Sequence, residues 1–300
     1  MHDGFGDIGA LSLRTRKSEP LGEGQIRVAI TVAGLNPIDW QIVESEALAS
    51  AFGISTPSGF GNDFAGTVVE IGRSVNRWRV GDRVYGGARG AAVATSVVLD
   101  EDHRSLHPTP DGISDRTAGV LDIAGRTASA VEDALNVQAG ETVLVGAAGG
   151  GVGSVLTQLL IHAGARVIGT GSASSSEFIR SLGAEPVEYG PDLLRNVRAA
   201  MTVPIAAAAD LYGTGTALTA LTLAVPPHRI VTIESDEPPA GVRAVNGSDA
   251  RPDALNRLTD LIIAGELTIP ISDVYSLENF AEAVGQQRRR HTRGKIAIET

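Results

Sequence analysis

The residues best suited to chemistry form a short glycine-rich segment near the middle of the chain. An apolar run, Thr142–Gly146, leads into Ala147–Gly153, which reads AAGGGVG. Such a loop lets the chain turn sharply out of a strand, brings backbone N–H groups close to a phosphate, and lets the next helix pack against the strand. Helical apolar spacing follows over Gly150–Ala163. This context predicts a dinucleotide site rather than a glycine-rich turn without a ligand.

The loop positions expected to touch the dinucleotide follow from this pattern. Ala148, Gly150 and Gly153 stand at the three glycine positions of a dinucleotide fingerprint. Gly151 and Val152 open the helix, where free N–H groups face the phosphates.

The end of the next expected strand indicates which dinucleotide is bound. A site for NAD places a carboxylate there to hold the ribose 2′-hydroxyl. This chain has Gly171 followed by Ser172 and further hydroxyls up to Ser175, and its first acid is Glu177. A carboxylate would repel a 2′-phosphate, so its absence favours NADPH over NADH. The phosphate's charge would need a cation that approaches in space, such as Arg180; the alternative is that the serines only cap the next helix.

Several other kinds of chemistry are disfavoured by the residue inventory. The 300 residues include no cysteine, which excludes cysteine-ligated zinc, and no two of the six histidines have the spacing of metal ligands on a helix. We therefore expect no metal site. The G-x-S-x-G motif of serine hydrolases is missing.

Charge and hydropathy point to a small-molecule partner. The formal net charge is −10, whereas a nucleic-acid surface needs clustered cations. No apolar run approaches the roughly 20 residues that span a bilayer, and the first residues are polar and glycine-rich, unlike a signal peptide. We expect a soluble, cytoplasmic protein without a nucleic-acid or membrane partner.

The elements that must position the loop form two patterns. Up to about residue 110 the chain is rich in short strands, with Gln25–Ala33 alternating at period two. From about Ser114 the spacing becomes helical over Asp115–Asp133, and from Glu141 strands and helices alternate, which predicts an α/β fold with a parallel sheet. Other expected elements are the strands 64–71, 83–85, 97–99, 166–170, 186–189, 229–234 and 295–299, and the helices 176–182 and 253–264.

Short motifs spread over nearly the whole chain carry a family resemblance. They are Gly34–Trp40 (GLNPIDW), Gly59–Gly72, Val80–Gly86 (VGDRVYG), Gly125–Ala128 (GRTA), the glycine loop, Ser181–Ala184 (SLGA) and His291–Ile296 (HTRGKI). In the order and spacing of these motifs, the chain resembles the medium-chain dehydrogenase/reductase superfamily, specifically its zinc-less quinone oxidoreductase-like branch. The resemblance implies a GroES-like β domain from residues 1–113 and 268–300. A Rossmann doubly wound domain from residues 114–267 would be inserted between these segments, with the cofactor in the cleft between domains.

The resemblance also implies roles for single residues. Residues matching Asn36, Gln41 and Thr127 meet the nicotinamide end, and those matching Ser172, Tyr189 and the Arg293/Lys295 region meet the adenosine phosphate. Asn62-Asp63 stands where zinc-dependent relatives carry His-Glu. Gln41 replaces the Lys or Tyr that is frequent in the family, which leaves no obvious proton donor. Asp39 would act as an acid or, as Asx residues commonly do, brace the loop that holds Asn36.

These observations predict zinc-independent hydride transfer from NADPH to a small electrophile, either a quinone or the β-carbon of an α,β-unsaturated carbonyl. Gln41, Thr127 or a backbone N–H would stabilise the developing oxyanion. The proton would come from water or from a ribose hydroxyl. The alternative is an NADPH-binding regulatory or structural protein with little turnover. The resemblance also implies a homodimer, for which the expected edge strand Arg229–Glu234 is the candidate interface.

Overall fold

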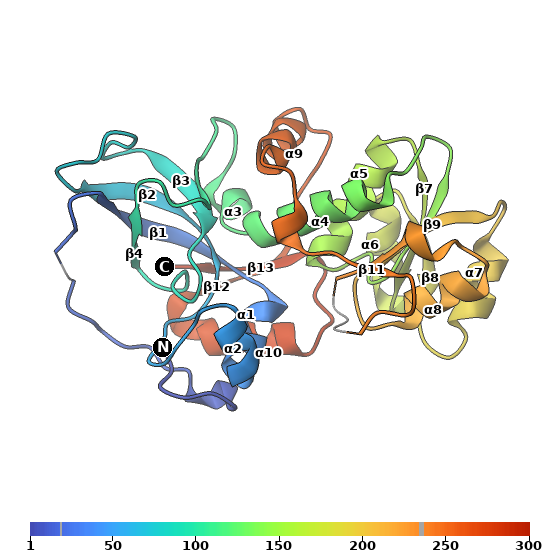
Figure 1. Ribbon diagram of the computed structural model, residues 1–300, viewed down its shortest axis with the longest axis horizontal. Helices are drawn as coiled ribbons and strands as arrows, with labels where there is room; N and C mark the ends of the chain where they lie inside the picture. Colours follow the sequence, from blue (N-terminus) through green and yellow to red (C-terminus); the bar gives the residue numbers. More distant parts are fainter. Residues whose placement is uncertain (19, 234–236) are drawn as a thin grey trace. The chain divides into compact units, whose positions relative to one another are not determined.

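The computed structural model describes residues 1–18, 20–233 and 237–300 (Figure 1). The chain forms two compact units. The first comprises Met1–Ile123 and Ile271–Thr300, and the second comprises Ala124–Pro270. The sequence placed these limits at residues 113 and 267 instead. None of the helices in the described ranges has both the length and the apolarity to cross a membrane.

A seven-stranded sheet forms the first unit, and β1 (Gln25–Leu35) is its central strand. One edge of β1 pairs antiparallel with β2 (Asp63–Ile71). The other edge pairs with β4 (Ser96–Asp100) at the start of β1 and with β13 (Lys295–Glu299) at its end. The last strand of the chain is therefore part of the first sheet, as predicted. The remaining strands are β3 (Arg83–Gly87), β5 (Leu106–Pro108) and β12 (Ile271–Ser276).

Short helices accompany this sheet. They are η1 (Ile8–Ala10), α1 (Pro37–Glu44), α2 (Glu46–Ala51), α3 (Asp115–Ala118), η5 (Leu277–Asn279) and α10 (Phe280–Arg288). α1 and α10 share one apolar cluster with β1 and β13, in which Leu35, Trp40, Val43, Phe280 and Ile296 are buried. This cluster anchors the loop between β1 and α1, which carries Asn36.

The second unit is a six-stranded parallel sheet in the order β11-β10-β9-β6-β7-β8. Its strands are β6 (Thr142–Val145), β7 (Arg166–Gly171), β8 (Glu185–Glu188), β9 (Ile205–Asp210), β10 (Ile230–Thr232) and β11 (Arg243–Ala244). Its helical segments are α4 (Asp122–Leu135), which begins in the first unit, α5 (Gly151–His162), η2 (Ala173–Ser175), α6 (Ser176–Ser181), α7 (Leu193–Ala200), α8 (Gly215–Thr222), η3 (Pro227–Arg229), η4 (Gly247–Asp249) and α9 (Ala254–Ile263).

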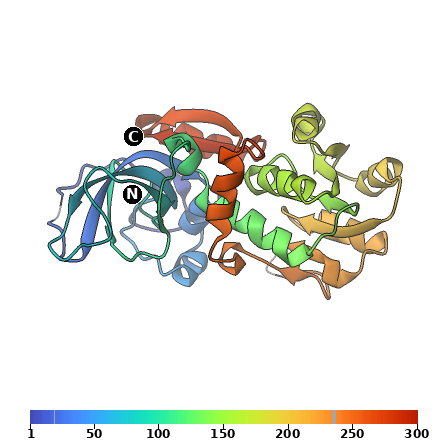
Figure 2. The same cartoon turned by 90° about the horizontal axis from the view of Figure 1, so that it is seen from above.

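Helices cover both faces of this sheet (Figure 2). Leu144 and Ile168 pack in one apolar cluster with Val197 of α7 and Ala217 of α8. The neighbouring Gly169 faces Ile179 of α6 instead. Because successive residues of a strand point to opposite faces, α6 lies on the other side of the sheet from α7 and α8. The predicted α/β fold with a doubly wound parallel sheet is confirmed.

Two predicted elements are wrong in detail. The single helix expected over Asp115–Asp133 is divided into α3 and α4. Between the two helices the chain makes i→i−3 bonds instead of i→i−4 bonds: the Val120 N–H donates to Thr117 O at 3.4 Å, and the Leu121 N–H donates to Ala118 O at 3.2 Å. The expected edge strand Arg229–Glu234 is also misplaced, because β11 pairs with β10 and takes the edge. Glu234 itself lies outside the described residues.

Candidate functional site

The glycine loop lies at the carboxyl ends of three adjacent parallel strands. In the order β9-β6-β7, the strands end at Asp210, Val145 and Gly171. The Gly146 N–H donates to Ala209 O at 2.7 Å, and the Ala148 N–H donates to Thr170 O at 3.0 Å, so the loop is held from both neighbouring strands. Ligands of open α/β sheets bind at the carboxyl ends of the strands. The loop therefore occupies the edge where such a ligand would lie.

The third glycine of the loop is required by close packing. A Cβ at Gly153 would lie 2.2 Å from Ala147 O and 2.9 Å from Ala148 Cα. Any side chain there would push α5 away from the end of β6. At Gly150 a Cβ would meet only Ala147 O, at 3.3 Å, within the described structure. Gly153 therefore serves helix packing, and Gly150 leaves the outer side of the loop open to a ligand, as the fingerprint requires.

The first turn of α5 presents free backbone donors. Gly150 is the N-cap residue and has no side chain with which to cap the helix. Gly151, Val152 and Gly153 supply the first N–H groups, which have no partner inside an α-helix. The partial positive charge of the helix N-terminus adds to their attraction for an anion. This geometry suits a pyrophosphate.

The end of β7 presents hydroxyl groups and no carboxylate. Ser172 Oγ lies 3.0 Å from Ser174 Oγ and 3.1 Å from Ser175 Oγ, and the Ser175 hydroxyl donates to Ser172 O at 2.9 Å. Ser175 is the N-cap residue of α6 but makes no side-chain cap bond in the described structure. The interpretation of Ser175 as a helix cap is therefore not supported.

Two further predicted residues flank this hydroxyl cluster. The Tyr189 N–H donates to Gly171 O at 3.1 Å, and its ring is half exposed. Gly171 is closely packed, because a Cβ there would lie 2.4 Å from Ile179 and 2.6 Å from Ser175 Oγ. Gly171, Ser172, Ser175 and Tyr189 thus lie together at the end of β7, and their predicted contacts with the cofactor stay predictions.

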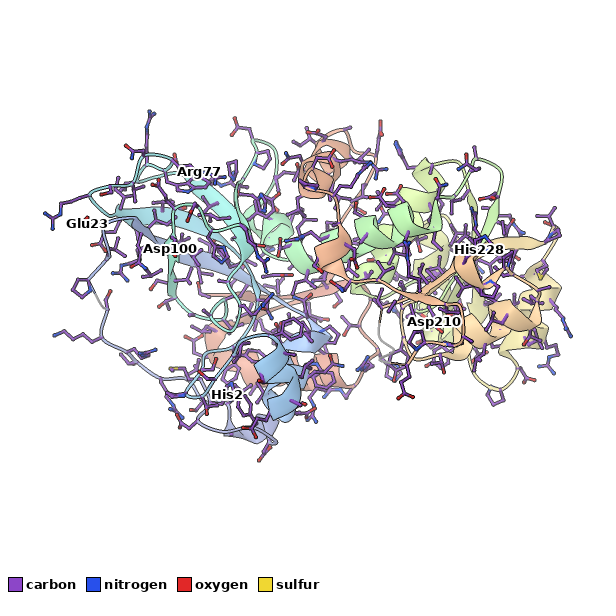
Figure 3. All side chains as sticks on the ribbon, in the orientation of Figure 1. His2, Glu23, Arg77, Asp100, Asp210 and His228 are labelled. Atoms are coloured by element: carbon purple, nitrogen blue, oxygen red, sulfur yellow. The ribbon has the colours of Figure 1, made fainter. Side chains whose placement is uncertain are left out.

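Thr170 and Asp210 were missed by the sequence analysis. Thr170 Oγ1 accepts the Ala147 N–H at 3.0 Å, which fixes the first loop residue in a left-handed conformation with φ of 50°. Asp210, labelled in Figure 3, lies at the end of β9. It is fully buried and accepts the Ala217 N–H at 2.8 Å and the Tyr212 N–H at 3.3 Å. The signal for Asp210 is the run IAAAAD, a small-residue strand that ends in an acid.

The first unit holds a buried polar cluster, formed by Asn36, Asp39, Asn62, Asp63 and Lys295. Each side chain is between 0% and 7% exposed. Asn36 Nδ2 donates to Asp63 Oδ2 at 3.0 Å, and the Lys295 ammonium donates to Asn36 Oδ1 and lies 3.4 Å from Asp63 Oδ2. The predicted residue Asn36 therefore lies at the centre of a charged network.

Asp39 braces the loop that carries Asn36. Its carboxylate accepts the Asn36 backbone N–H at 2.8 Å and a hydrogen bond from Asn62 Nδ2. Burial, aided by the nearby charge of Asp63, raises the pKa of Asp39 to about 7. Burial also raises the pKa of Asp63, while the Lys295 ammonium opposes that change. Of the two roles considered for Asp39, its contacts therefore support the bracing of the Asn36 loop.

Gln41 and Thr127 belong to different units. Gln41 lies on α1, one turn beyond the Asn36 loop, and is half-buried. Thr127 lies on α4 in the second unit and is 7% exposed. Their predicted roles at the nicotinamide stay predictions.

The family follows from comparison with known proteins. Residues 22–111 match the alcohol dehydrogenase GroES-like domain, and residues 94–298, more than half of the chain, match the zinc-binding dehydrogenase family. The chain belongs to the medium-chain dehydrogenase/reductase superfamily. The first unit is its GroES-like domain and the second its Rossmann domain.

Three relatives illustrate the breadth of this superfamily. The quinone oxidoreductase from Coxiella burnetii is 26% identical, with a TM-score of 0.84 over 100% of this chain and 98% of its own. The chloroplastic NADPH-dependent alkenal/one oxidoreductase of Arabidopsis thaliana is 26% identical over 99% of this chain and 78% of its own length. The spectinabilin polyketide synthase system protein NorB of Streptomyces orinoci is 36% identical over 55% of this chain. This chain covers 3–8% of the length of NorB and of five polyketide synthases that it also matches.

The zinc that the name of the matched zinc-binding dehydrogenase family implies does not fit the residues present. Where the resemblance implies the His-Glu pair of zinc-dependent members, this chain has Asn62-Asp63, and it has no cysteine. Asp63 is already engaged by Asn36, Lys295 and the Ile123 N–H, and the ammonium would repel a dication. The described residues include no group of three or more His, Asp or Glu side chains that could hold a metal ion.

The contacts of Lys295 show that its predicted role at the phosphate site is wrong. From the sequence, Lys295 is expected beside Arg293 near the adenosine phosphate. The Lys295 side chain is 3% exposed, and its ammonium is bound by Asn36 and Asp63, so it is not available to a phosphate. Arg293 is exposed in the first unit, and Arg180 is exposed on α6 of the second unit. Arg293 and Arg180 both stay candidate cations for the cofactor.

Proposed function

We propose that this medium-chain dehydrogenase/reductase is a zinc-independent, NADPH-dependent oxidoreductase that reduces a quinone or an α,β-unsaturated carbonyl. The observation that carries the proposal is the set of groups at the carboxyl edge of the Rossmann sheet. There the Gly150–Gly153 segment offers N–H groups without a side-chain cap, and the adjacent strand β7 is followed by Ser172 and no carboxylate. Together they suit a dinucleotide whose ribose carries a 2′-phosphate.

The proposed binding roles follow from this edge. Ala148, Gly150, Gly151, Val152 and Gly153 hold the pyrophosphate through backbone donors. Gly171, Ser172, Ser175 and Tyr189 hold the adenosine ribose and its phosphate, with Arg180 and Arg293 as the candidate counter-charges. The hydroxyls of Ser172 and Ser175 can donate to phosphate oxygens without the repulsion that a carboxylate would add.

The proposed roles at the reacting end are fewer. When bound, the reduced nicotinamide supplies a hydride from its C4. Asn36 holds the nicotinamide ribose, and Gln41 and Thr127 supply neutral hydrogen bonds to the carbonyl oxygen that becomes negative as the acceptor is reduced. A proton then reaches the reduced acceptor from water or from a ribose hydroxyl. The names of the Arabidopsis and Coxiella relatives support the two acceptor classes, an alkenal or alkenone and a quinone.

Stopped-flow mixing tests the proposal. The protein is first mixed with NADPH or NADH, and then with a quinone or an enone, while absorbance at the nicotinamide band is followed. The proposal expects oxidation of NADPH by at least one acceptor and weaker use of NADH. Tight NADPH binding with no oxidation by any acceptor would favour a binding protein with little turnover. The resemblance further supports a homodimer, which sedimentation equilibrium would test.

A further inference from the structure

Lys295 and Asp63 approach the side-chain amide of Asn36 from its two ends. Asp63 opens β2 and Lys295 opens β13, the two strands that flank the end of β1, directly before Asn36. The Lys295 ammonium donates to Asn36 Oδ1, and Asn36 Nδ2 donates to Asp63 Oδ2 at 3.0 Å. The Ile123 N–H holds the other oxygen of Asp63 at 3.2 Å. The amide is therefore clamped between two charges brought together by three strands.

The chemistry of the two partners allows only one orientation of this amide. An ammonium can only donate hydrogen bonds, and an ionised carboxylate can only accept them. Turning the amide over would place its NH₂ against the ammonium and its oxygen against the carboxylate. The orientation of Asn36 is therefore set by charge. These contacts use one of its two N–H groups and one of the two lone pairs of its oxygen, which leaves each end of the amide capable of one more bond.

Folding alone gives little reason for these two charges. Lys295 is 3% exposed and Asp63 is 0% exposed, so both lose nearly all their hydration. An apolar pair of similar volume often stabilises a fold as well or better than a buried ion pair. An apolar pair, however, offers no hydrogen bond that could hold the neighbouring Asn36 amide in one of its two orientations.

We propose that Lys295 and Asp63 are positioning residues, which orient the Asn36 amide for its contact with the nicotinamide ribose and act on the reaction through Asn36. This inference rests on the proposed function, in which Asn36 makes that contact. It removes Lys295 from the phosphate site and gives it a role at the opposite end of the cofactor.

The test replaces both charges together, so that neither is left buried without a partner. The variant Lys295→Met/Asp63→Leu is compared with Asn36→Ala and with the triple variant that combines them. The matched control is Arg27→Met/Glu70→Leu, which removes the ion pair joining β1 to β2 at 2.8 Å. For each protein the Kd for NADPH is titrated, and kcat and KM are measured with the acceptor that the wild-type protein uses.

The proposal expects the double variant to lose activity in kcat/KM on the order of 10- to 100-fold while the control retains wild-type kinetics. Asn36→Ala should lose a similar factor, and the triple variant should lose no more than Asn36→Ala alone, because the charges act through that amide. Multiplied losses in the triple variant, or wild-type kinetics in the double variant, would overturn the inference.

Nuclear magnetic resonance supplies a readout that needs neither activity nor the double variant. In wild-type protein labelled with ¹⁵N-asparagine, the Asn36 side-chain amide, assigned from Asn36→Asp, should give one pair of slowly exchanging protons. Fast exchange or two sets of signals would contradict a single clamped orientation. A wild-type protein that neither binds NADPH nor reduces any acceptor would refute the proposed function instead, whatever this spectrum shows.

Discussion

The phosphate edge of the Rossmann unit and the polar cluster of the GroES-like unit use different chemical groups. The phosphate edge of the Rossmann unit uses backbone N–H groups on consecutive residues, and its glycines serve by lacking side chains. The polar cluster of the GroES-like unit uses side chains from distant positions, since Asn36 is 27 residues from Asp63 and 259 from Lys295. A backbone site tolerates almost no added atoms. A side-chain site depends instead on charge balance.

The first way to test this contrast is to add a side chain to the backbone site. In Gly153→Val the new Cβ would lie 2.2 Å from Ala147 O, so α5 must move away from the loop. We expect NADPH affinity to fall by on the order of 100-fold or more, because a shift of about 1 Å is enough to misplace a bound group. Fluorescence titration of NADPH measures this.

A glycine in the same unit serves as the control. Gly215 opens α8, and none of the described atoms lies within 4 Å of the position a Cβ would take. Gly215→Ala should retain NADPH affinity. If Gly153→Val binds NADPH as tightly as Gly215→Ala does, the loop is not the phosphate site.

The second test unbalances the charges of the polar cluster. Lys295→Met leaves Asp63 buried without its cation, and we expect the free energy of unfolding to fall by about 3–5 kcal/mol. Arg27→Met breaks an ion pair whose acid, Glu70, is half exposed, and should cost about 1 kcal/mol or less. Urea denaturation of both variants measures the difference. Equal losses would mean that the cluster behaves like a surface ion pair.

The third test measures how the free energy of unfolding depends on pH through the buried acid Asp39. Its pKa is about 7 in the folded protein and near 3.8 when unfolded, so between these values the folded state binds more protons. Stability contributed by this group is therefore present at low pH and is lost as the pH rises towards 7, by up to about 4 kcal/mol.

The variant Asp39→Asn isolates this contribution. It should show a flatter decline in the free energy of unfolding from pH 4 to 7, since Asn62 can turn its amide to accept from the new side chain. Asp63 and Lys295 face the same cluster and remain in both proteins. Because the charge of Asp63 acts on Asp39, the difference between the two curves includes that interaction. Parallel curves for wild type and variant would show that Asp39 does not hold its proton at neutral pH.

The smallest expected effect concerns the choice of cofactor. Ser172→Glu places a carboxylate at the end of β7, where it would repel a 2′-phosphate and accept a ribose 2′-hydroxyl. We expect the ratio of NADPH to NADH affinity to fall about tenfold, which corresponds to about 1.4 kcal/mol. Ser181→Glu, which adds the same charge at an exposed position on α6, is the control. An unchanged ratio in Ser172→Glu would remove the basis for preferring NADPH.

The same contrast explains what the sequence could reveal. The run from Thr142 to His162 is continuous, and β6, the loop and α5 lie where the sequence predicted, to within a residue or two. β9 was missed because Ile205–Asp210 is mostly alanine, which favours no strand by composition. Lys295 was assigned to the wrong end of the cofactor because its motif says nothing about where an ammonium 259 residues from Asn36 will point.

Hydride transfer itself is tested most directly with deuterium. NADPH that carries deuterium at C4 of the nicotinamide is mixed with the protein and an α,β-unsaturated ketone, and the product is analysed by mass spectrometry and NMR. Because the cofactor has two faces, both stereoisomers of the labelled NADPH are used. The account predicts deuterium on the β-carbon of the saturated product from one of the two isomers. A reduced product without deuterium from either isomer would contradict direct transfer. An unchanged ketone, together with an unchanged quinone in the parallel stopped-flow assay, would contradict the proposed oxidoreductase.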